Sequence, residues 1–339
     1  MFNLKSLITP HLIKGKKCFV AYSGGVDSTV LLNEVGKAAN EFNSEVEAVH
    51  VNHGYSKSSE SWEEHCKIFC KKKGFSFKSF QMDSKNLKGA SLESLMRERR
   101  YEIFQKILID KTSLLFMGHH LDDQIETLFF RLIRGTGLKG ASSIPLKRNL
   151  GNGFIVRPFL KVAKEEIIQN AIQNNLSFVE DDSNNNNDFD RNYLRNIVIP
   201  KISERWPNYR KSISRSIDNQ KDSFEFLTEI SKKELVKIVK GEDIKINELK
   251  KYDVNFQKIL FLSWLENKKC NLPNSAVLEE IINKFIHSEK TSCPKHIWGS
   301  KNKGNEVCLI IKKGRCQLRL AKRFFYTIHN CFKGRSYCV

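Results

Sequence analysis

Long hydrophobic runs are missing from this sequence. Hydrophobic residues make up 40% of its 339 residues, yet no stretch reaches the ~18 consecutive apolar residues that a membrane-spanning helix needs. The opening stretch MFNLKSLITPHLIKGKK is also too polar to contain the apolar core of a signal peptide. We therefore expect a cytoplasmic protein with no membrane partner, and the length allows two domains with a small third.

Paired cysteine motifs are missing as well. The nine cysteines are odd in number and scattered, and none forms a Cys-x-x-Cys pair. This pattern argues for reduced thiols and against a disulfide framework. Cys66 and Cys70 would share one face of a helix, but no second ligand pair lies nearby in the sequence. We interpret them as small buried hydrophobic residues and assign no metal to cysteine.

Acidic residues are scarce at the C-terminal end, although the chain as a whole carries a net charge of +19. Residues 291–339 contain 11 Lys and Arg but one acidic residue, Glu306. Within 310–325, basic residues alternate with Leu and Phe, so that one face can pack while the other meets phosphates. We favour a nucleic-acid-binding segment over a basic patch that serves solubility. The predicted contact residues are Lys312, Lys313, Arg315 and Arg319.

Apolar and amphipathic segments alternate along the first 120 residues. This alternation predicts an α/β fold in which a parallel sheet carries helices on both faces. The expected strands are 17–22, 46–51, 75–82 and 114–118, and the expected helices are 28–40, 59–73 and 91–108. We expect a substrate-facing loop over 134–158, a short helix near 164–174, helices from Pro200 to about 290, and short strands after that. The predicted domains are 1–205, 206–290 (helical) and 291–339 (basic, in contact with nucleic acid).

The six residues SGGVDS, 23–28, interrupt the first strand-to-helix passage. Two adjacent glycines allow a ligand to approach the backbone closely, and the NH groups at the start of a helix favour an anion. The stretch lacks the Gly-Lys-Ser/Thr ending of a Walker A loop and the Gly-x-Gly-x-x-Gly pattern of a dinucleotide turn. We therefore predict a phosphate-binding turn of another kind.

A second polar motif, GHHLDDQIET, 118–127, follows the strand at 114–118. On a helix that starts near Asp122, the side chains of Asp123, Glu126 and Thr127 lie on one face. Paired carboxylates at the end of a strand, beside a phosphate loop, can hold Mg²⁺ or an ammonium group.

The SGGVDS stretch resembles the loop of the ATP-pyrophosphatase (PP-loop) superfamily. The Gly-His-His-x-x-Asp-Gln-x-Glu-Thr pattern at 118–127 is similar to that of the tRNA(Ile)-lysidine synthetase family. Tyr55-Ser56 stands where the family often has Leu-Arg, and the resemblance is thin after residue 207. Further family-like pieces are HVNHG (50–54), RERRY (97–101), RGTGLKG (134–140), RPFL (157–160), EDDSN (180–184), RNYLRNIVIP (191–200) and RWP (205–207).

This resemblance implies a reaction and a set of roles, with catalysis in 1–205 and tRNA bound by 206–290 and contacted by 291–339. ATP would adenylate the wobble cytidine of tRNA(Ile), and free lysine would then displace AMP to give lysidine. ATP would be bound by Ser23, Gly24, Gly25, Val26, Asp27 and Ser28, with the backbone near His50 and Val51 at the adenine. Asp27 would engage Mg²⁺ and pyrophosphate, Asp123 and Glu126 would bind the lysine ammonium groups, and Arg97 or Arg100 would stabilise developing charge.

Two other interpretations stay open at this point. A related 2-thiocytidine synthetase would use Cys-x-x-Cys cysteines, which this chain lacks. A non-catalytic RNA-binding protein with the same fold would be expected to lose the loop or the carboxylates, and both are intact. The sequence does not give the oligomeric state, so a homodimer is also left open.

Overall fold

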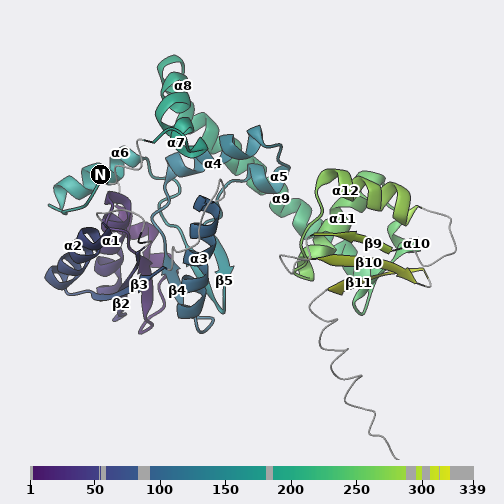
Figure 1. Ribbon diagram of the computed structural model, residues 1–339, viewed down its shortest axis with the longest axis horizontal. Helices are drawn as coiled ribbons and strands as arrows, with labels where there is room; N and C mark the ends of the chain where they lie inside the picture. The colour runs from purple at the N-terminus through teal and green to yellow at the C-terminus, as the bar shows by residue number, and fades with distance from the viewer. Residues whose placement is uncertain are drawn as a thin grey trace, which may run out of the picture. The chain divides into compact units, whose positions relative to one another are not determined.

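The structure is a computed structural model that describes residues 3–52, 54, 59–82, 92–180, 186–287, 295–299, 306–312 and 314–320. The chain divides into two units, Met1–Asp222 and Ser223–Val339 (Figure 1). The boundary falls within one long helix, α9 (Tyr209–Ile238). Each unit has its own hydrophobic core. The three-part division stays a prediction.

A six-stranded sheet forms the centre of the first unit, with strand order β3-β2-β1-β4-β6-β5. Strands β1 to β4 and β6 run parallel, and β5 pairs antiparallel with β6 at the edge. The predicted parallel sheet is therefore confirmed. The strands are β1 (Cys18–Ala21), β2 (Val46–Asn52), β3 (Ser76–Gln81), β4 (Leu114–Phe116), β5 (Lys147–Leu150) and β6 (Gly153–Val156).

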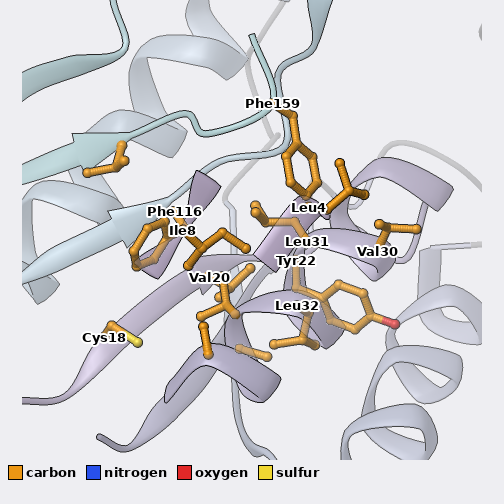
Figure 2. Packing of buried hydrophobic residues seen from close by; sticks show 14 of the residues in the cluster. Leu4, Ile8, Cys18, Val20, Tyr22, Val30, Leu31, Leu32, Phe116 and Phe159 are labelled. Carbon is orange, nitrogen blue, oxygen red and sulfur yellow. The ribbon is translucent and has the colours of Figure 1, made fainter. Parts of the chain in front are cut away.

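Helices cover both faces of this sheet because its strands are apolar on both sides. On one face, Val20 of β1 and Phe116 of β4 pack with Leu31 of α1 (Figure 2). On the other, Leu115 of β4 packs with Phe104 of α3. The helices of this part are η1 (Leu4–Leu7), η2 (Thr9–His11), α1 (Val26–Glu41), α2 (Ser59–Lys73), α3 (Leu92–Ile107), α4 (Leu121–Ile133), α5 (Leu138–Ala141) and α6 (Lys164–Gln173).

The region 134–158 corrects one expectation, because much of it is regular structure and not an open loop. It contains α5 and the β5–β6 hairpin, which turns at Gly151 with a φ of 58°. Strand β6 buries Ile155 and Val156 beside β4, which explains why this short segment joins the sheet. The expected helix near 164–174 is confirmed by α6.

The last part of the first unit is helical. Helices α7 (Asp190–Tyr193), η4 (Leu194–Val198) and α8 (Ile199–Arg205) follow one another without a break. Ile199 and Tyr209 pack against Leu121 and Ile125 of α4. This packing places the 190–205 segment beside the start of α4.

The second unit combines helices with an antiparallel sheet of order β7-β8-β11-β10-β9. The expectation of helices from Pro200 to about 290 is wrong at two strands, β7 and β8. They form because β8 pairs with β11 and β7 pairs with β8. The short strands expected near the end of the chain are confirmed. The elements are β7 (Val239–Lys240), β8 (Asp243–Lys245), α10 (Ile246–Leu249), α11 (Val254–Asn267), α12 (Ser275–Glu280), η5 (Ile281–Ile286), β9 (Lys295–Trp298), β10 (Val307–Lys312) and β11 (Arg315–Leu320).

Apolar side chains from both layers form the second core. Trp264 of α11 and Ile282 of η5 are almost fully buried, as are Leu309 of β10 and Cys316 of β11. Among the described helices, none combines the length and the hydrophobicity needed to cross a bilayer.

Candidate active site

The predicted phosphate turn joins β1 to α1. Gly25 is the N-cap residue of α1, and Gly24 has a φ of 90°, a conformation that favours glycine. A Cβ atom on Gly24 would lie 2.9 Å from both Cys66 Sγ and Val179 Cγ2. The Gly24 carbonyl accepts a hydrogen bond of 3.0 Å from the Val179 backbone NH. Both the backbone angle and the surrounding space therefore require glycine at this position.

Hydroxyl groups hold the turn in place from within. Ser28 Oγ accepts from the Ser23 backbone NH at 3.2 Å and donates to the Gly25 carbonyl at 2.9 Å. Thr29 Oγ1 donates to the same carbonyl at 3.0 Å. The first NH groups of an α-helix have no partner within the helix, so those of Val26 and Asp27 are available to an anion. The turn is thus shaped for phosphate by its own hydrogen bonds.

A pocket of about 200 Å³ opens beside this turn. Its lining combines the polar turn residues Ser23, Asp27 and Ser28 with apolar side chains, among them Val49 and Phe104. A pocket with such a mixed lining suits a ligand that has both an apolar and an anionic group. It is lined by Ala21, Tyr22, Ser23, Asp27, Ser28, Val49, Val51, Arg100, Phe104, Met117, Gly118 and His119.

The residues predicted for the adenine differ in where their side chains lie. Val51 lines the pocket, as does its neighbour on the same face of β2, Val49. His50 is not among the lining residues, because successive side chains of a strand point to opposite faces. Its Nδ1 lies 2.9 Å from the carbonyl oxygen of Tyr22, and burial lowers the pKa of the ring. The His50 side chain therefore links β2 to β1.

The two predicted arginines of α3 also differ. Arg100 lines the pocket, whereas the guanidinium of Arg97 lies 5.3 Å from the centre of the Tyr101 ring. Burial would raise the pKa of Tyr101, but the charges of Arg97 and Arg157 lower it. Arg97 therefore belongs to a group of cations at the border of the pocket.

Helix α4 starts directly against the phosphate turn. A Cβ atom on Gly118 would lie 3.1 Å from the carbonyl group of Asp27, so a larger residue here would have to push this backbone aside by a few tenths of an ångström. His120 caps α4, and its backbone NH donates to Asp123 Oδ2 at 2.9 Å. His120 Nε2 lies 3.8 Å from Asp27 Oδ1 and 3.5 Å from Asp123 Oδ2. The phosphate turn and the carboxylates of α4 thus meet around one buried imidazole.

Asp123 and Glu126 lie together, as the sequence predicts, but a third residue joins them. Arg195 of η4 donates from Nε to Glu126 Oε1 at 2.6 Å and from Nη2 to Oε2 at 2.9 Å. The same guanidinium lies 3.5 Å from Asp123 Oδ1. Sequence analysis gave Arg195 no role, although it lies within the quoted RNYLRNIVIP stretch.

Glu126 is buried, with 2% of its side chain exposed. Burial raises the pKa of its carboxyl group above the ordinary value, and the hydrogen bonds from Arg195 offset only part of this rise. Burial alone would lower the pKa of Arg195, but its bonds with Glu126 raise it overall. The ion pair thus opposes the effect of burial on Glu126, and another cation can reach the carboxylate by competing with Arg195.

Asp27 has a partner that the sequence did not indicate. Lys164, the first residue of α6, donates from Nζ to both carboxylate oxygens of Asp27, at 2.6 and 2.7 Å. The Lys164 backbone NH donates to Asp122 Oδ2 at 3.0 Å, and Arg210 Nε donates to Asp122 Oδ1 at 2.7 Å. Lys164 lies far from the turn in sequence, so no local pattern indicates this pairing.

Asp27, the predicted Mg²⁺ ligand, has a partly exposed side chain. Within the described residues, no group of three His, Cys, Asp or Glu side chains is placed to hold a metal ion. Mg²⁺ is usually bound by one or two carboxylates together with substrate phosphates, so a single partly exposed Asp27 fits such a site. Its carboxylate would then be shared with, or released by, Lys164.

Three of the predicted RNA-contacting residues, Lys312, Arg315 and Arg319, lie on strands β10 and β11 of the second unit. Lys312 pairs with Arg315 across the hairpin, and Arg319 pairs with Cys308. The Arg315 side chain is exposed. Lys313 and the side chains of Lys312 and Arg319 lie outside the described residues.

Comparison with known proteins places this geometry in a family. Residues 2–202 match the PP-loop domain family. The tRNA(Ile)-lysidine synthase of Coxiella burnetii is 36% identical over 267 residues, which cover 79% of this chain and 59% of the relative. The synthase of Legionella pneumophila strain Philadelphia 1 is 33% identical over 306 residues, which cover 88% of this chain and 69% of the relative.

A solved structure agrees with the fold. The U34-tRNA thiolase NcsA from Methanococcus maripaludis aligns with a TM-score of 0.50 and 19% identity, covering 64% of this chain and 76% of that one. This likeness shows the fold alone. The chain spans 59 to 65% of the length of the synthases from Coxiella, Buchnera aphidicola (Schizaphis graminum) and Legionella strain Lens. On the match over residues 2–202 and the identity with these synthases, the chain belongs to the PP-loop family of the tRNA(Ile)-lysidine synthases.

Proposed function

We propose that this chain ligates lysine to C2 of the wobble cytidine of a tRNA(Ile) with a CAU anticodon, with ATP as the energy source. The observation that carries the proposal is the meeting of the phosphate turn with Asp123 and Glu126 around His120. The similarity to tRNA(Ile)-lysidine synthases supports the choice of substrates.

The first step is adenylation of the RNA. The turn 23–28 holds the triphosphate by its NH groups and hydroxyls, and the apolar pocket wall at Val49 and Val51 packs against the adenine. The cytidine O2 attacks the α-phosphate, the bond to pyrophosphate breaks, and pyrophosphate leaves. Asp27 would hold Mg²⁺, and the ion when bound would neutralise phosphate charge. Arg100, at the pocket wall, stabilises charge that develops on the phosphate or the cytidine oxygen.

The second step joins the amino acid. Asp123 and Glu126 bind the ammonium groups of free lysine, which compete with Arg195 for the carboxylates. The ε-amine attacks C2 of the adenylated cytidine, the C2–O2 bond breaks, and AMP leaves with that oxygen. A carboxylate whose pKa is raised by burial is a better proton acceptor than an exposed one, so Glu126 accepts the proton from the attacking amine.

The alternative reaction is sulfur transfer to tRNA, and the burial of Cys66 and Cys70 argues against it. Cys66 and Cys70 lie buried on α2, and burial raises the pKa of both thiols to about 12. Such thiols are poor nucleophiles near neutral pH. A homodimer stays a prediction.

The deciding experiment is mass analysis of nucleosides from tRNA(Ile) transcript incubated with ATP and isotope-labelled lysine. We expect one labelled nucleoside at the wobble position and one AMP and one pyrophosphate per product. Asp27→Ala should give no product while it still binds the RNA, because the contacts of the RNA lie elsewhere. ATP consumption without labelled RNA in the wild type would refute the proposed function.

A further inference from the structure

Beside the pocket lies a group of cations that the proposed reaction leaves without a role. Four of them come from different elements of the first unit, and the fifth, Arg157, directly follows β6. We name this group the arginine cluster. It consists of Arg97 (α3), Arg131 (α4), Arg148 (β5), Arg157 and Arg191 (α7).

Several contacts bring these arginines together. The guanidinium groups of Arg97 and Arg148 lie 5.3 and 4.9 Å from the centre of the Tyr101 ring. Arg157 lies close enough to bond the Tyr101 side chain. Burial lowers the pKa of Arg131, and the charges of Arg191 and Arg97 lower it further. The five side chains therefore contribute to one field of positive potential.

The groups that hold the cluster in place are neutral. Arg131 Nη1 donates to the carbonyls of Gly140 and Ser143, at 3.0 and 2.8 Å. Arg157 is 2% exposed, and its Nη1 donates to the Pro145 carbonyl at 2.9 Å. The buried Nε of Arg157 has no hydrogen-bond partner. Within the described residues, no salt bridge joins any of the five arginines to a carboxylate.

This arrangement has an energetic cost unless an anion binds. Like charges in a partly buried site repel one another more strongly than in water, and a buried donor without a partner costs about 1–3 kcal/mol. His119, which lines the pocket, lies in the same field. Burial holds the pKa of His119 well below its ordinary value, and the charges of Arg157 and Arg100 lower it further. The positive potential of the cluster thus reaches His119 at the pocket wall.

We propose that the arginine cluster binds backbone phosphates of the RNA substrate next to the nucleotide that is modified. Arginine suits this role because its planar guanidinium binds phosphate through two parallel hydrogen bonds. The phosphates of ATP have a separate site at the turn 23–28, whereas Arg97 and Arg148 are exposed and do not line the pocket. An RNA chain can contact the exposed members, Arg97 and Arg148, while the buried Arg157 adds to the positive potential that attracts it. This inference rests on the proposed function, which supplies an RNA substrate.

The test uses two exposed members of the cluster, so that the fold is preserved. Arg148→Gln and the double variant Arg97→Gln/Arg148→Gln are compared with Arg99→Gln, which removes one exposed positive charge from α3, the helix that carries Arg97. Arg99 is exposed and pairs with Glu102 at 3.2 Å, outside the cluster. Binding of an anticodon stem-loop RNA is measured as a function of salt, without ATP or lysine, and ATP binding is measured separately. Thermal unfolding checks that all variants are folded.

Each phosphate contact contributes roughly 0.7 to 0.9 to the salt slope of the affinity. We expect the double variant to lose about 1.4 to 1.8 of this slope and on the order of tenfold in RNA affinity, with ATP binding unchanged. A slope equal to that of Arg99→Gln would overturn the inference. So would weaker ATP binding with unchanged RNA binding, because the cluster would then serve the nucleotide.

The same measurements separate this inference from the proposed function. If the wild type forms the labelled nucleoside but the double variant keeps its salt slope, the cluster has no role in RNA binding and the function stands. If the wild type forms no product but the slope falls, the RNA site stands and the reaction must be revised.

Discussion

The adjacent residues His119 and His120 have opposite electrostatic surroundings. His120 caps α4 and lies near Asp27, Asp122 and Asp123. His119 faces the arginine side, where burial and positive charge hold its pKa well below the ordinary value. The carboxylates of the site therefore lie around His120, and the arginines lie around the adjacent residue, His119. This separation suits a reaction that binds both a cationic amino acid and polyanionic substrates.

Glu126→Gln tests the amino acid site. The amide keeps the shape of the side chain but lacks the charge that binds an ammonium group, so we expect the KM for lysine to rise by about tenfold to a hundredfold. The KM for ATP should stay within about twofold. Both constants come from steady-state assays in which lysine and ATP are varied in turn.

The wild type should also lose activity as the pH falls through the pKa of Glu126. Because burial raises this pKa, the loss should occur at less acidic pH than for an exposed glutamate. The Gln variant should lack that limb of the profile. Equal increases in both KM values would instead place the carboxylate on Mg²⁺ and phosphate.

Individual residues also show what the sequence could predict. Asp123 and Glu126 were predicted to share a helix face, because spacing along a helix is a local property. Arg195 and Lys164 were missed because they reach the site from helices far along the chain. The His50 side chain lies on the opposite face from the pocket, as the alternation along a strand requires, although the sequence alone did not show which face would hold the ligand.

At the scale of elements, the N-termini of three helices converge on the site. Gly25, His120 and Ala163 are the N-cap residues of α1, α4 and α6. Lysine at the first position of a helix is unfavourable by about 0.3–1 kcal/mol, because the N-terminus carries partial positive charge. Lys164 occupies this position in α6, and Asp27 and Asp122 offset the cost. A cation placed there against the helix dipole indicates a role in binding.

Lys164→Ala tests this role. Without the ammonium group, the α1 N-terminus loses a positive charge beside the phosphate turn, and we expect ATP affinity to fall about tenfold in calorimetric titrations. The free energy of unfolding in urea should change by less than about 1 kcal/mol, because the ion pair is partly exposed.

The matched control is Lys161→Ala, which removes an exposed lysine that pairs with Asp218 at 3.1 Å. It should leave ATP binding unchanged. Equal ATP affinity in both variants would show that Lys164 only holds Asp27 in place.

Long, strongly patterned elements were predicted well, and short ones were not. The expected helix 59–73 agrees with α2, and the strand 46–51 agrees with β2 to within one residue. Strands β7 and β8 have two and three residues, too few for a period to be recognised. β8 becomes a strand because the distant strand β11 pairs with it, and β7 in turn pairs with β8.

At the scale of the whole molecule, positive charge is unevenly distributed, and the basic end supports one prediction. Replacing Lys312, Lys313, Arg315 and Arg319 with Ser should flatten the salt dependence of tRNA binding, by roughly 0.7 to 0.9 per lost phosphate contact. The KM for tRNA should rise, while the rate at saturating tRNA stays nearly constant. Binding is followed by filter retention over a range of salt concentrations.

The control removes the same number of charges from the first unit. Lys67, Lys71, Lys72 and Lys73 lie exposed on α2, and their replacement with Ser should leave the slope unchanged. An equal effect of both quadruple variants would mean that only net charge matters, and no effect of either would make the hairpin an ordinary solvated surface.

The pairing of β8 with β11 has a consequence for how the chain is made. At about 5–20 residues per second, a ribosome needs roughly 4 to 14 s to pass from Lys245 to Arg315. During that interval β8 has β7 on one side and an open edge on the other. The first unit completes its sheet with β6, at Val156, long before this point. The nascent second unit therefore exposes an unpaired strand edge after the whole sheet of the first unit has been synthesised, and a chaperone that covers exposed strand edges would protect the chain most during this interval.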